Sequence, residues 1–293
     1  MKQFIQSIDE QIESNKGKNI FLEDPELFKF ISNTVNAISY IDDVDKDYEN
    51  YLVNYTADKA IDEFCRINQY YSFDSKSKLE LRKIYSTLFS ELRNRKDNLE
   101  EISVKHYLRL KDWLQRSNHF AEYLYSNDGQ NVDPVPCFEY SPSLQMAILH
   151  LDVENLMQPV LDVGCGKHGN MVVYLSDRKI RACGIDRTKF TNPDLITSDW
   201  LEYDYGVEKW GTVISNLGFS NHFNNHNLRE DGNYIGYART YMNILRSLKV
   251  GGCFHYVPNL PFMEKYLDES QFSVKTYSLD DYDFNTTVVQ RLK

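Results

Sequence analysis

A short apolar run leads into three closely spaced glycines at residues 160–169 (VLDVGCGKHG). The first four of these residues read as a buried strand. Gly164, Gly166 and Gly169 follow, before a helical pattern at residues 171–175. Glycines let the backbone turn tightly and let a ligand approach the N-terminus of the next helix. The order of strand, glycine turn and helix predicts a wound α/β domain that binds a nucleotide-like ligand at the turn.

The alternation of short apolar runs, turns and helices continues after this turn. We predict strands at residues 160–163, 181–185, 195–197, 213–215 and 253–257, helices at 171–175 and 234–248, and a closing antiparallel pair at 272–277 and 287–291. The first four strands lack polar alternation, as parallel strands buried on both faces do. The expected fold class is therefore α/β with one mostly parallel sheet.

The first part of the chain has a different pattern, in which apolar residues recur three and four apart, as in amphipathic helices. The sets that would share a helix face are Phe4, Ile5, Ile8 and Ile12; Leu27, Ile31, Val35 and Ile38; Tyr48, Leu52 and Tyr55; Leu81, Ile84, Leu88 and Leu92; and Leu110, Leu114 and Ala121. The stretch Asn127–Pro136 is rich in Gly, Pro, Asn and Asp and predicts a linker. We therefore expect a helical domain over residues 1–136 and an α/β domain over residues 137–293, whose first helix runs from Ser141 to Val153.

Charge and composition narrow the class of partner. The formal net charge is −10, and acidic residues are spread along the chain. Such a surface repels a phosphate backbone, so nucleic acid is disfavoured and a small-molecule substrate is favoured. The N-terminal residues lack the apolar core of a signal peptide, and no run predicts a membrane span. Five scattered cysteines without CxxC pairs are typical of reduced thiols, so we expect a cytoplasmic protein without a metal site.

Acidic residues at the ends of the first three strands help to choose the ligand. Asp162 lies two residues before the first glycine, where an anion opposes a pyrophosphate but suits a ligand with an ammonium and a sulfonium. Asp186 ends the next strand, where a carboxylate can accept both ribose hydroxyls. Asp199 could accept from an adenine amino group while Trp200 packs on the ring. An ordinary helix cap for Asp199 and a core position for Trp200 remain open.

In this order, these residues resemble the class I S-adenosylmethionine (SAM)-dependent methyltransferases over residues 141–293. The resemblance places Asp162, Gly164, Gly166 and Gly169 in the family's first motif, Asp186 at its ribose-binding acid, Asp199 at its adenine-side acid, Ser215-Asn216 in its motif after the fourth strand, and residues 248–252 in the turn before the fifth. It implies a seven-stranded sheet with helices on both faces and SAM as the cofactor. Cys165, Arg187, Trp200, Asn216 and Tyr140 complete the expected cofactor contacts. The connections after Asp186 and Asp199 are too short for crossover helices, so we expect loops or single turns there.

Residues 215–223 (SNLGFSNHF) follow the fourth strand, where wound sheets place ligands. Asn216 lacks the two prolines of the Asn-Pro-Pro-aromatic motif of amino methyltransferases, so that activity is not inferred. His222 and His226 lie four apart, a spacing used in some zinc sites, but no third ligand is evident nearby. We predict that His222 is a general base, with Asn216 as a second catalytic candidate; the alternative is that both histidines are polar loop residues.

The expected reaction is in-line transfer of the SAM methyl group to an O or N atom of a small molecule, such as a natural product. The helical domain would act as a lid that selects this substrate. Two other classes stay open. A non-catalytic SAM-binding or interaction protein would keep the same cofactor residues, and an NAD-dependent enzyme is supported by the G-x-G-x-x-G spacing of the glycines alone.

Overall fold

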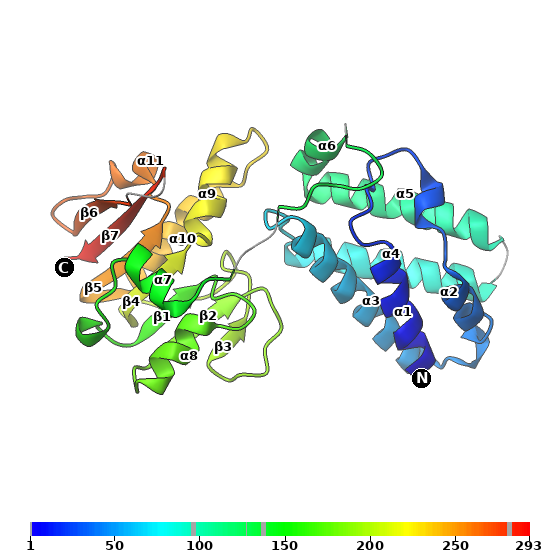
Figure 1. Cartoon of the computed structure of the whole chain (residues 1–293), viewed down its shortest axis with the longest axis horizontal. Helices are drawn as coiled ribbons and strands as arrows, with labels where there is room; N and C mark the ends of the chain where they lie inside the picture. The colour runs from blue at the N-terminus through cyan, green and yellow to red at the C-terminus, as the bar shows by residue number, and fades with distance from the viewer. Residues whose placement is uncertain (1, 95–97, 127, 136–138, 280–282) are drawn as a thin grey trace. The chain divides into compact units, whose positions relative to one another are not determined.

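The computed structural model describes residues 2–94, 98–126, 128–135, 139–279 and 283–293. The chain divides into two compact units, Met1–Cys137 and Phe138–Lys293. The first is helical and the second contains the sheet (Figure 1).

The second unit is built on a seven-stranded sheet. Its strands are β1 (Val160–Val163), β2 (Ala182–Asp186), β3 (Leu195–Thr197), β4 (Trp210–Asn216), β5 (Leu248–Val257), β6 (Phe272–Ser278) and β7 (Asn285–Arg291). Their order is β3-β2-β1-β4-β5-β7-β6, and β7 runs antiparallel to both of its neighbours. The α/β prediction and the closing antiparallel pair are therefore confirmed. The strand order reverses at β1, and wound sheets bind ligands beside the carboxyl ends of the strands at such a point.

Helices cover both faces of this sheet (Figure 1). On one face, α7 (Pro142–Ile148) and α8 (Asn170–Asp177) pack against Val160, Ile214 and Val257. On the other, α9 (Phe219–Leu228) and α10 (Tyr234–Ser247) pack against residues such as Leu161, Val213 and Phe254. Side chains alternate along a strand, so adjacent residues of β1 enter opposite layers of the core. The remaining helices of this unit are the 3₁₀ turn Val153–Asn155 and α11 (Pro261–Glu264).

The boundaries of β4, β5 and α7 differ most from the sequence prediction. β4 and β5 begin earlier than predicted, because Trp210 pairs with Leu248 before an irregularity that leads to the Thr212–Cys253 pair. Gly251 and Gly252 interrupt the apolar run there and conceal the extension. The helix after Ser141 ends at Ile148 instead of Val153. Its last carbonyls are engaged by the sheet: the Thr286 hydroxyl donates to the Ile148 carbonyl, and His255 Nδ1 lies 3.0 Å from the Leu149 oxygen.

The connections after β2 and β3 contain turns and no helix, as predicted. Residues 187–194 link β2 to β3, and residues 198–209 link β3 to β4, and all of these residues are described. Both connections therefore run from the carboxyl ends of the strands as loops.

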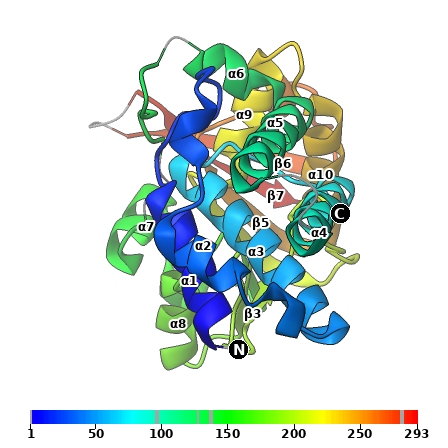
Figure 2. The same ribbon diagram turned by 90° about the vertical axis from the view of Figure 1, so that its right-hand side faces the viewer.

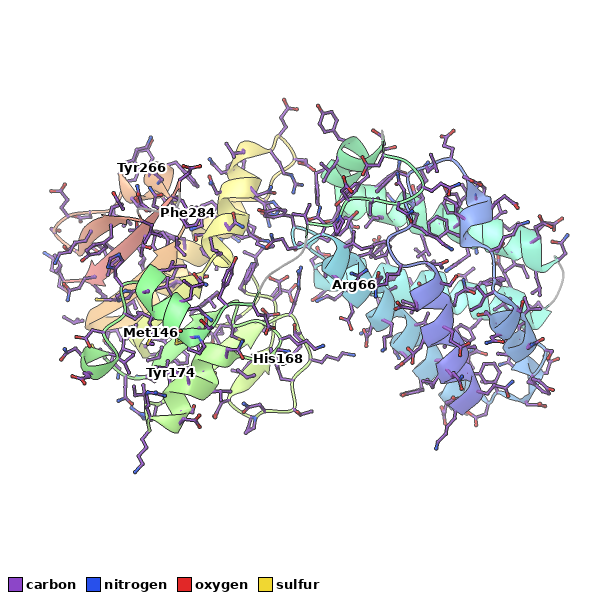
Figure 3. All side chains as sticks on the ribbon, in the orientation of Figure 1. Arg66, Met146, His168, Tyr174, Tyr266 and Phe284 are labelled. Carbon is purple, nitrogen blue, oxygen red and sulfur yellow. The ribbon has the colours of Figure 1, made fainter. Side chains whose placement is uncertain are left out.

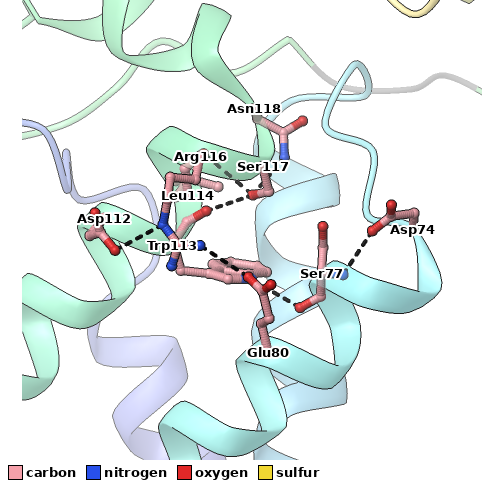
Figure 4. Close-up of polar contacts among 9 residues, drawn as sticks. All are labelled: Asp74, Ser77, Glu80, Asp112, Trp113, Leu114, Arg116, Ser117 and Asn118. Atoms are coloured by element: carbon pink, nitrogen blue, oxygen red, sulfur yellow. Dashed lines mark hydrogen bonds and ion pairs between the residues drawn. The ribbon is translucent and has the colours of Figure 1, made fainter.

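The first unit consists of helices packed on a common core (Figure 2). They are α1 (Lys2–Ser14), α2 (Ser32–Ile38), α3 (Lys46–Ile67), α4 (Ser75–Asn94), α5 (Leu99–Ser117) and α6 (His119–Tyr125), with 3₁₀ turns at Pro25–Phe28 and Ile41–Asp43. Leu52, Leu81 and Trp113 are fully buried in this core. Figure 4 shows how α4 and α5 are joined: the Trp113 indole donates to the Ser77 carbonyl, and Arg116 contacts Glu80.

Two of the expected continuous helix faces are divided. Leu27 lies in a 3₁₀ turn and Val35 in α2, because Ile31 between them is extended. The Gln11 side chain holds this extended segment by donating to the Lys29 carbonyl and accepting from the Ile31 N–H.

The helix expected through Leu110, Leu114 and Ala121 breaks at Asn118. Its side-chain oxygen accepts from the Ser72 N–H at 3.0 Å, and its amide donates to the Ser72 carbonyl. These bonds to a residue 46 positions away separate α5 from α6.

The predicted linker is paired with the first unit over its described part, residues 128–135. Val132 donates to the Gly17 carbonyl, and Val135 donates to the Ile67 carbonyl at 2.7 Å. Asn19 also donates to the Asp128 and Gly129 carbonyls from its side chain. Asn127 and Pro136, the ends of the predicted linker, lie outside the described residues. Among the described helices, none is both long enough and apolar enough to cross a membrane.

Candidate functional site

The turn after β1 depends on glycine at three positions. Gly164, Gly166 and Gly169 have φ values of +82°, +73° and +57°, a region that other residues rarely adopt. The Gly164 and Cys165 N–H groups donate to the Ile185 carbonyl and fix the turn to β2. The sequence therefore determines this turn locally, at the carboxyl end of β1.

The three glycines also accept close neighbours. A β-carbon on Gly164 would stand 3.0 Å from the Trp200 ring, and one on Gly166 would stand 3.3 Å from Glu139 Oε1. A β-carbon on Gly169 would overlap Leu195 at 2.6 Å. The missing side chains at Gly164 and Gly166 thus leave room for Trp200 and Glu139. Gly169 permits packing between the start of α8 and β3.

Asp162 lies within β1 and is 3 % exposed. Burial, and to a smaller extent the charge of Asp186, raises the pKa of Asp162 from 3.8 to about 7. The carboxyl group therefore takes up a proton much more readily than an exposed aspartate does, and a cation beside it would favour the ionised form. The structure thus has a buried carboxyl group at this strand end.

Asp186 ends β2 beside the same turn. One oxygen accepts from the Gly166 N–H at 3.2 Å, and the other accepts from the N–H and hydroxyl of Thr188, both at 3.0 Å. These bonds hold the carboxylate at the strand end. The next residue, Arg187, is exposed, and its charge is one of the causes that lower the pKa of His222.

Asp199 and Trp200 follow β3. Asp199 Oδ1 accepts from the Leu201 N–H at 2.9 Å within a turn, and the described residues 200–209 form no helix for it to cap. The Trp200 ring lies against Gly164 and meets the His222 ring edge-on, with 5.0 Å between centroids. Trp200 is only partly buried, and it connects the glycine turn with α9.

Asn216 ends β4 opposite the glycine turn. The turn that follows it touches the first one, since the Gly218 Cα lies 3.6 Å from the position of a Gly164 β-carbon. The Ser215 hydroxyl donates to the Val163 carbonyl at 2.8 Å and joins the two strand ends. Both polar atoms of the Asn216 side chain are buried without a hydrogen-bond partner among the described residues. Buried polar groups are nearly always paired, so this amide is a candidate for binding a ligand.

His222 and His226 both lie on α9 and differ in their surroundings. His222 is 5 % exposed, and burial first, then the charges of Arg187 and His226, hold its pKa well below 6.5. His226 Nδ1 accepts from the Asn233 N–H at 3.1 Å, and its ring stacks on Tyr237. His226 thus stabilises the connection between α9 and α10, whereas His222 faces Trp200.

Two other predicted cofactor residues, Cys165 and Tyr140, make contacts within the protein. The Cys165 side chain packs with Val172 and Leu195, and burial raises its thiol pKa. The Tyr140 carbonyl accepts from the Gln145 side chain at 2.9 Å.

Glu139 precedes the predicted contact Tyr140 and touches the glycine turn. Its Oε1 accepts from the His168 N–H at 3.2 Å, and its other oxygen lies 3.9 Å from His168 Nε2. Figure 3 labels His168 on the segment that leads into α8. Glu139 lies shortly before the helix start at Ser141-Pro142 in the sequence. The local pattern there does not predict a hydrogen bond to His168, which lies 29 residues later.

Solved methyltransferases are among the structures to which this chain is similar. A TehB-like SAM-dependent methyltransferase from Corynebacterium glutamicum is 17 % identical, with 47 % of this chain and 85 % of that one covered at a TM-score of 0.34. An rRNA methylase from Streptococcus thermophilus is 16 % identical, with 54 % and 99 % covered at a TM-score of 0.37. The 1,6-didemethyltoxoflavin-N1-methyltransferase of Burkholderia thailandensis, solved with S-adenosylhomocysteine, is 14 % identical. The match covers 52 % of this chain and 76 % of that one at a TM-score of 0.33. No protein-family model matches the chain, and no curated protein matches it.

The strand order and the antiparallel β7 decide the fold. It is the class I methyltransferase fold. The similarity to the solved proteins concerns the fold alone. The interpretation of the site rests on the residues around Gly164.

Proposed function

We propose that this protein is a SAM-dependent methyltransferase acting on an O or N atom of a small molecule. The observation that carries the proposal is the position of Asp162, whose carboxyl group is buried next to the glycine turn. The glycines of this turn have no side chains, so other groups can come close to its backbone. A pyrophosphate at this turn would face Asp162, Asp186 and Glu139, and like charges in a low-dielectric site are strongly unfavourable. A ligand with an ammonium and a sulfonium gains from the same three carboxylates.

The residues present fit such a cofactor. We assign the amino-acid end of SAM to Asp162 and the glycine turn, and the ribose hydroxyls to Asp186. Trp200 and Asp199 are the candidates for the adenine side, and Arg187, Cys165 and Tyr140 stay as proposed peripheral contacts. When bound, SAM supplies an electrophilic methyl group. The chain itself contributes position and the exclusion of water.

His222 and Asn216 are the proposed catalytic residues. Because the pKa of His222 is held well below 6.5, the imidazole is neutral and accepts hydrogen bonds at physiological pH. It therefore suits a role in orienting the O–H or N–H of the acceptor. A weak base is sufficient to take the proton once the acceptor atom carries positive charge. The unpartnered Asn216 amide can hold a polar group of the acceptor beside it.

The small-molecule proposal is supported by charge. The net charge of −10 opposes association with a polyanion. The cofactor motifs all lie in the second unit, so we further propose that the helical unit selects the substrate as a lid.

The experiment that tests the cofactor is calorimetry with SAM, S-adenosylhomocysteine and NAD on the full chain. Micromolar binding of the first two, at least tenfold weaker in Asp186→Ala, would support the proposal. Asp177→Asn is the matched control, since Asp177 is exposed at the end of α8. Binding of NAD would instead favour an oxidoreductase. SAM binding without turnover on any acceptor would favour a non-catalytic SAM-binding protein.

A further inference from the structure

The core of the helical unit contains a cavity of about 120 Å³. Residues from α1, α2, α3, α4 and α5 line it, together with the first 3₁₀ turn. Ile8, Ile38 and Phe89 represent its mainly aliphatic and aromatic wall. Among the described residues that line it, none carries an ionisable Asp, Glu, Lys or Arg side chain. A charged ligand would find no counterion here, so the cavity suits a neutral one.

His106 of α5 lies on this wall. It is 9 % exposed, its ring lies 5.1 Å from that of Tyr85, and its Nδ1 atom is buried without a hydrogen-bond partner among the described residues. Burial first, then the charge of Arg109, lowers the pKa of His106 to about 3, and Glu91 opposes this effect. The ring is therefore neutral at physiological pH. An unpartnered nitrogen on the wall of a cavity is a feature that a ligand can satisfy.

Three hydroxyl groups on the same wall are arranged as acceptors. Ser7, Thr56 and Ser103 each donate to a backbone carbonyl of their own helix, at distances between 2.8 and 3.1 Å. Their hydrogens are thus used, and only oxygen lone pairs remain for another molecule. At these three positions, a ligand can pair only through a hydrogen-bond donor of its own.

We propose that this cavity is a binding site for a small, uncharged aromatic molecule with one hydroxyl group, that is, a phenol. The volume of about 120 Å³ is of the same order as that of an apolar cavity of about 150 Å³ that binds benzene, so a single ring is the largest ligand that we expect to fit. A hydroxyl can donate to a lone pair or accept from an N–H, so it can pair with His106 Nδ1 in either tautomer. The site lies within Met1–Cys137 and does not depend on the proposed methyl transfer.

Phenol and toluene are the probes, because they have nearly the same shape and differ in the hydroxyl. Titration calorimetry of the full chain should show phenol binding about threefold to tenfold more tightly than toluene, the range for one net hydrogen bond. In His106→Leu, phenol should bind no more tightly than toluene, while toluene binding changes by less than about threefold. His119→Leu is the control, since His119 is exposed in the same unit.

A second variant tests the location without removing a polar group. Ala37 lines the cavity and is 2 % exposed, so Ala37→Leu fills part of the space. Binding of both probes should fall at least tenfold in this variant, with the circular dichroism spectrum unchanged. The proposal is overturned if the wild type binds neither probe, if it binds toluene at least as tightly as phenol, or if Ala37→Leu binds both normally. If His106→Leu does not fold, the proposal is still tested by the affinities of the wild type and of Ala37→Leu for phenol and toluene.

Discussion

The Trp200 ring lies directly over Gly164, 3.0 Å from where a β-carbon would stand. This contact connects the loop after β3 with the turn after β1, two segments that both leave the carboxyl edge of the sheet. A side chain at position 164 would therefore displace Trp200, which we assign to the cofactor pocket.

Gly164→Ala should destabilise the fold and abolish SAM binding. The positive φ alone costs about 1–2 kcal/mol for alanine, and the overlap with Trp200 adds to this. Gly251→Ala is a matched control, because Gly251 has a φ of +83° but no neighbour within 4 Å. Denaturant unfolding of both variants separates the backbone effect from the contact. Equal losses of stability would contradict the importance of the Trp200 contact.

Asp162→Asn should make the cofactor-free protein more stable at neutral pH. A pKa of about 7, against 3.8 in the unfolded chain, corresponds to at most about 4 kcal/mol of destabilisation once the pH exceeds 7. Below the unfolded value the acid is neutral in both states and has no effect. Wild-type stability should accordingly decline between pH 4 and pH 7, and the variant should lack this decline.

The same variant should bind SAM at least tenfold more weakly, because the amide carries no charge to meet the ammonium group. Unfolding curves at pH 4 and pH 8, with calorimetry at pH 8, check both effects. A variant that is no more stable than wild type at pH 8 would show that the Asp162 carboxyl is not strained by burial.

His222→Phe should lower kcat at least tenfold while the Kd for SAM changes little. Phenylalanine keeps a ring against Trp200 but removes both nitrogens. Because the pKa of His222 lies well below 6.5, wild-type kcat should not fall as the pH is lowered through 6.5. Steady-state rates between pH 5 and pH 8 provide the measurement. A titration step near 6.5 that disappears in the variant would show a more basic imidazole than the structure indicates.

His226→Phe serves as the comparison on the same helix. It should lower the free energy of unfolding by about 1 kcal/mol, because the Asn233 N–H loses its acceptor. Its kcat should stay within about threefold of wild type, since His226 holds a connection and does not face the turn.

Glu139→Gln should weaken SAM binding about tenfold, since it removes a charge from the carboxylates around the turn. The bond to the His168 N–H would persist with the amide oxygen, so stability should change little. Glu154→Gln is the control, with an exposed acid in the same segment before β1. Calorimetry at two salt concentrations is the measurement, and unchanged affinity would remove Glu139 from the site.

The sheet could be predicted from sequence because its strands are continuous apolar runs with turns between them. The glycine turn was predictable for a similar reason, since its three positive φ values are a local property of Gly164, Gly166 and Gly169. Helix boundaries depended on distant partners. Asn118 divides α5 from α6 through Ser72, and the sheet limits α7 through Thr286. No local pattern encodes such contacts.

The positions of the acidic residues in the candidate site could be predicted from the sequence, but the contacts between distant residues could not. Asp162 and Asp186 follow strand ends, so their position could be derived from the pattern. The approach of Glu139 to His168 spans 29 residues of chain, and the unpartnered amide of Asn216 results from packing around β4. Both features require the folded arrangement.

The position of Trp200 also gives the protein its own optical reporter. Of the three tryptophans, Trp113 and Trp210 are buried at 1 % and 4 % exposure, each with its indole N–H bonded to a backbone carbonyl. Trp200 alone among them is partly exposed, and it lies on the turn assigned to the cofactor. Changes in intrinsic emission on ligand addition will therefore come chiefly from this one residue, so binding at the turn can be followed in the unlabelled protein.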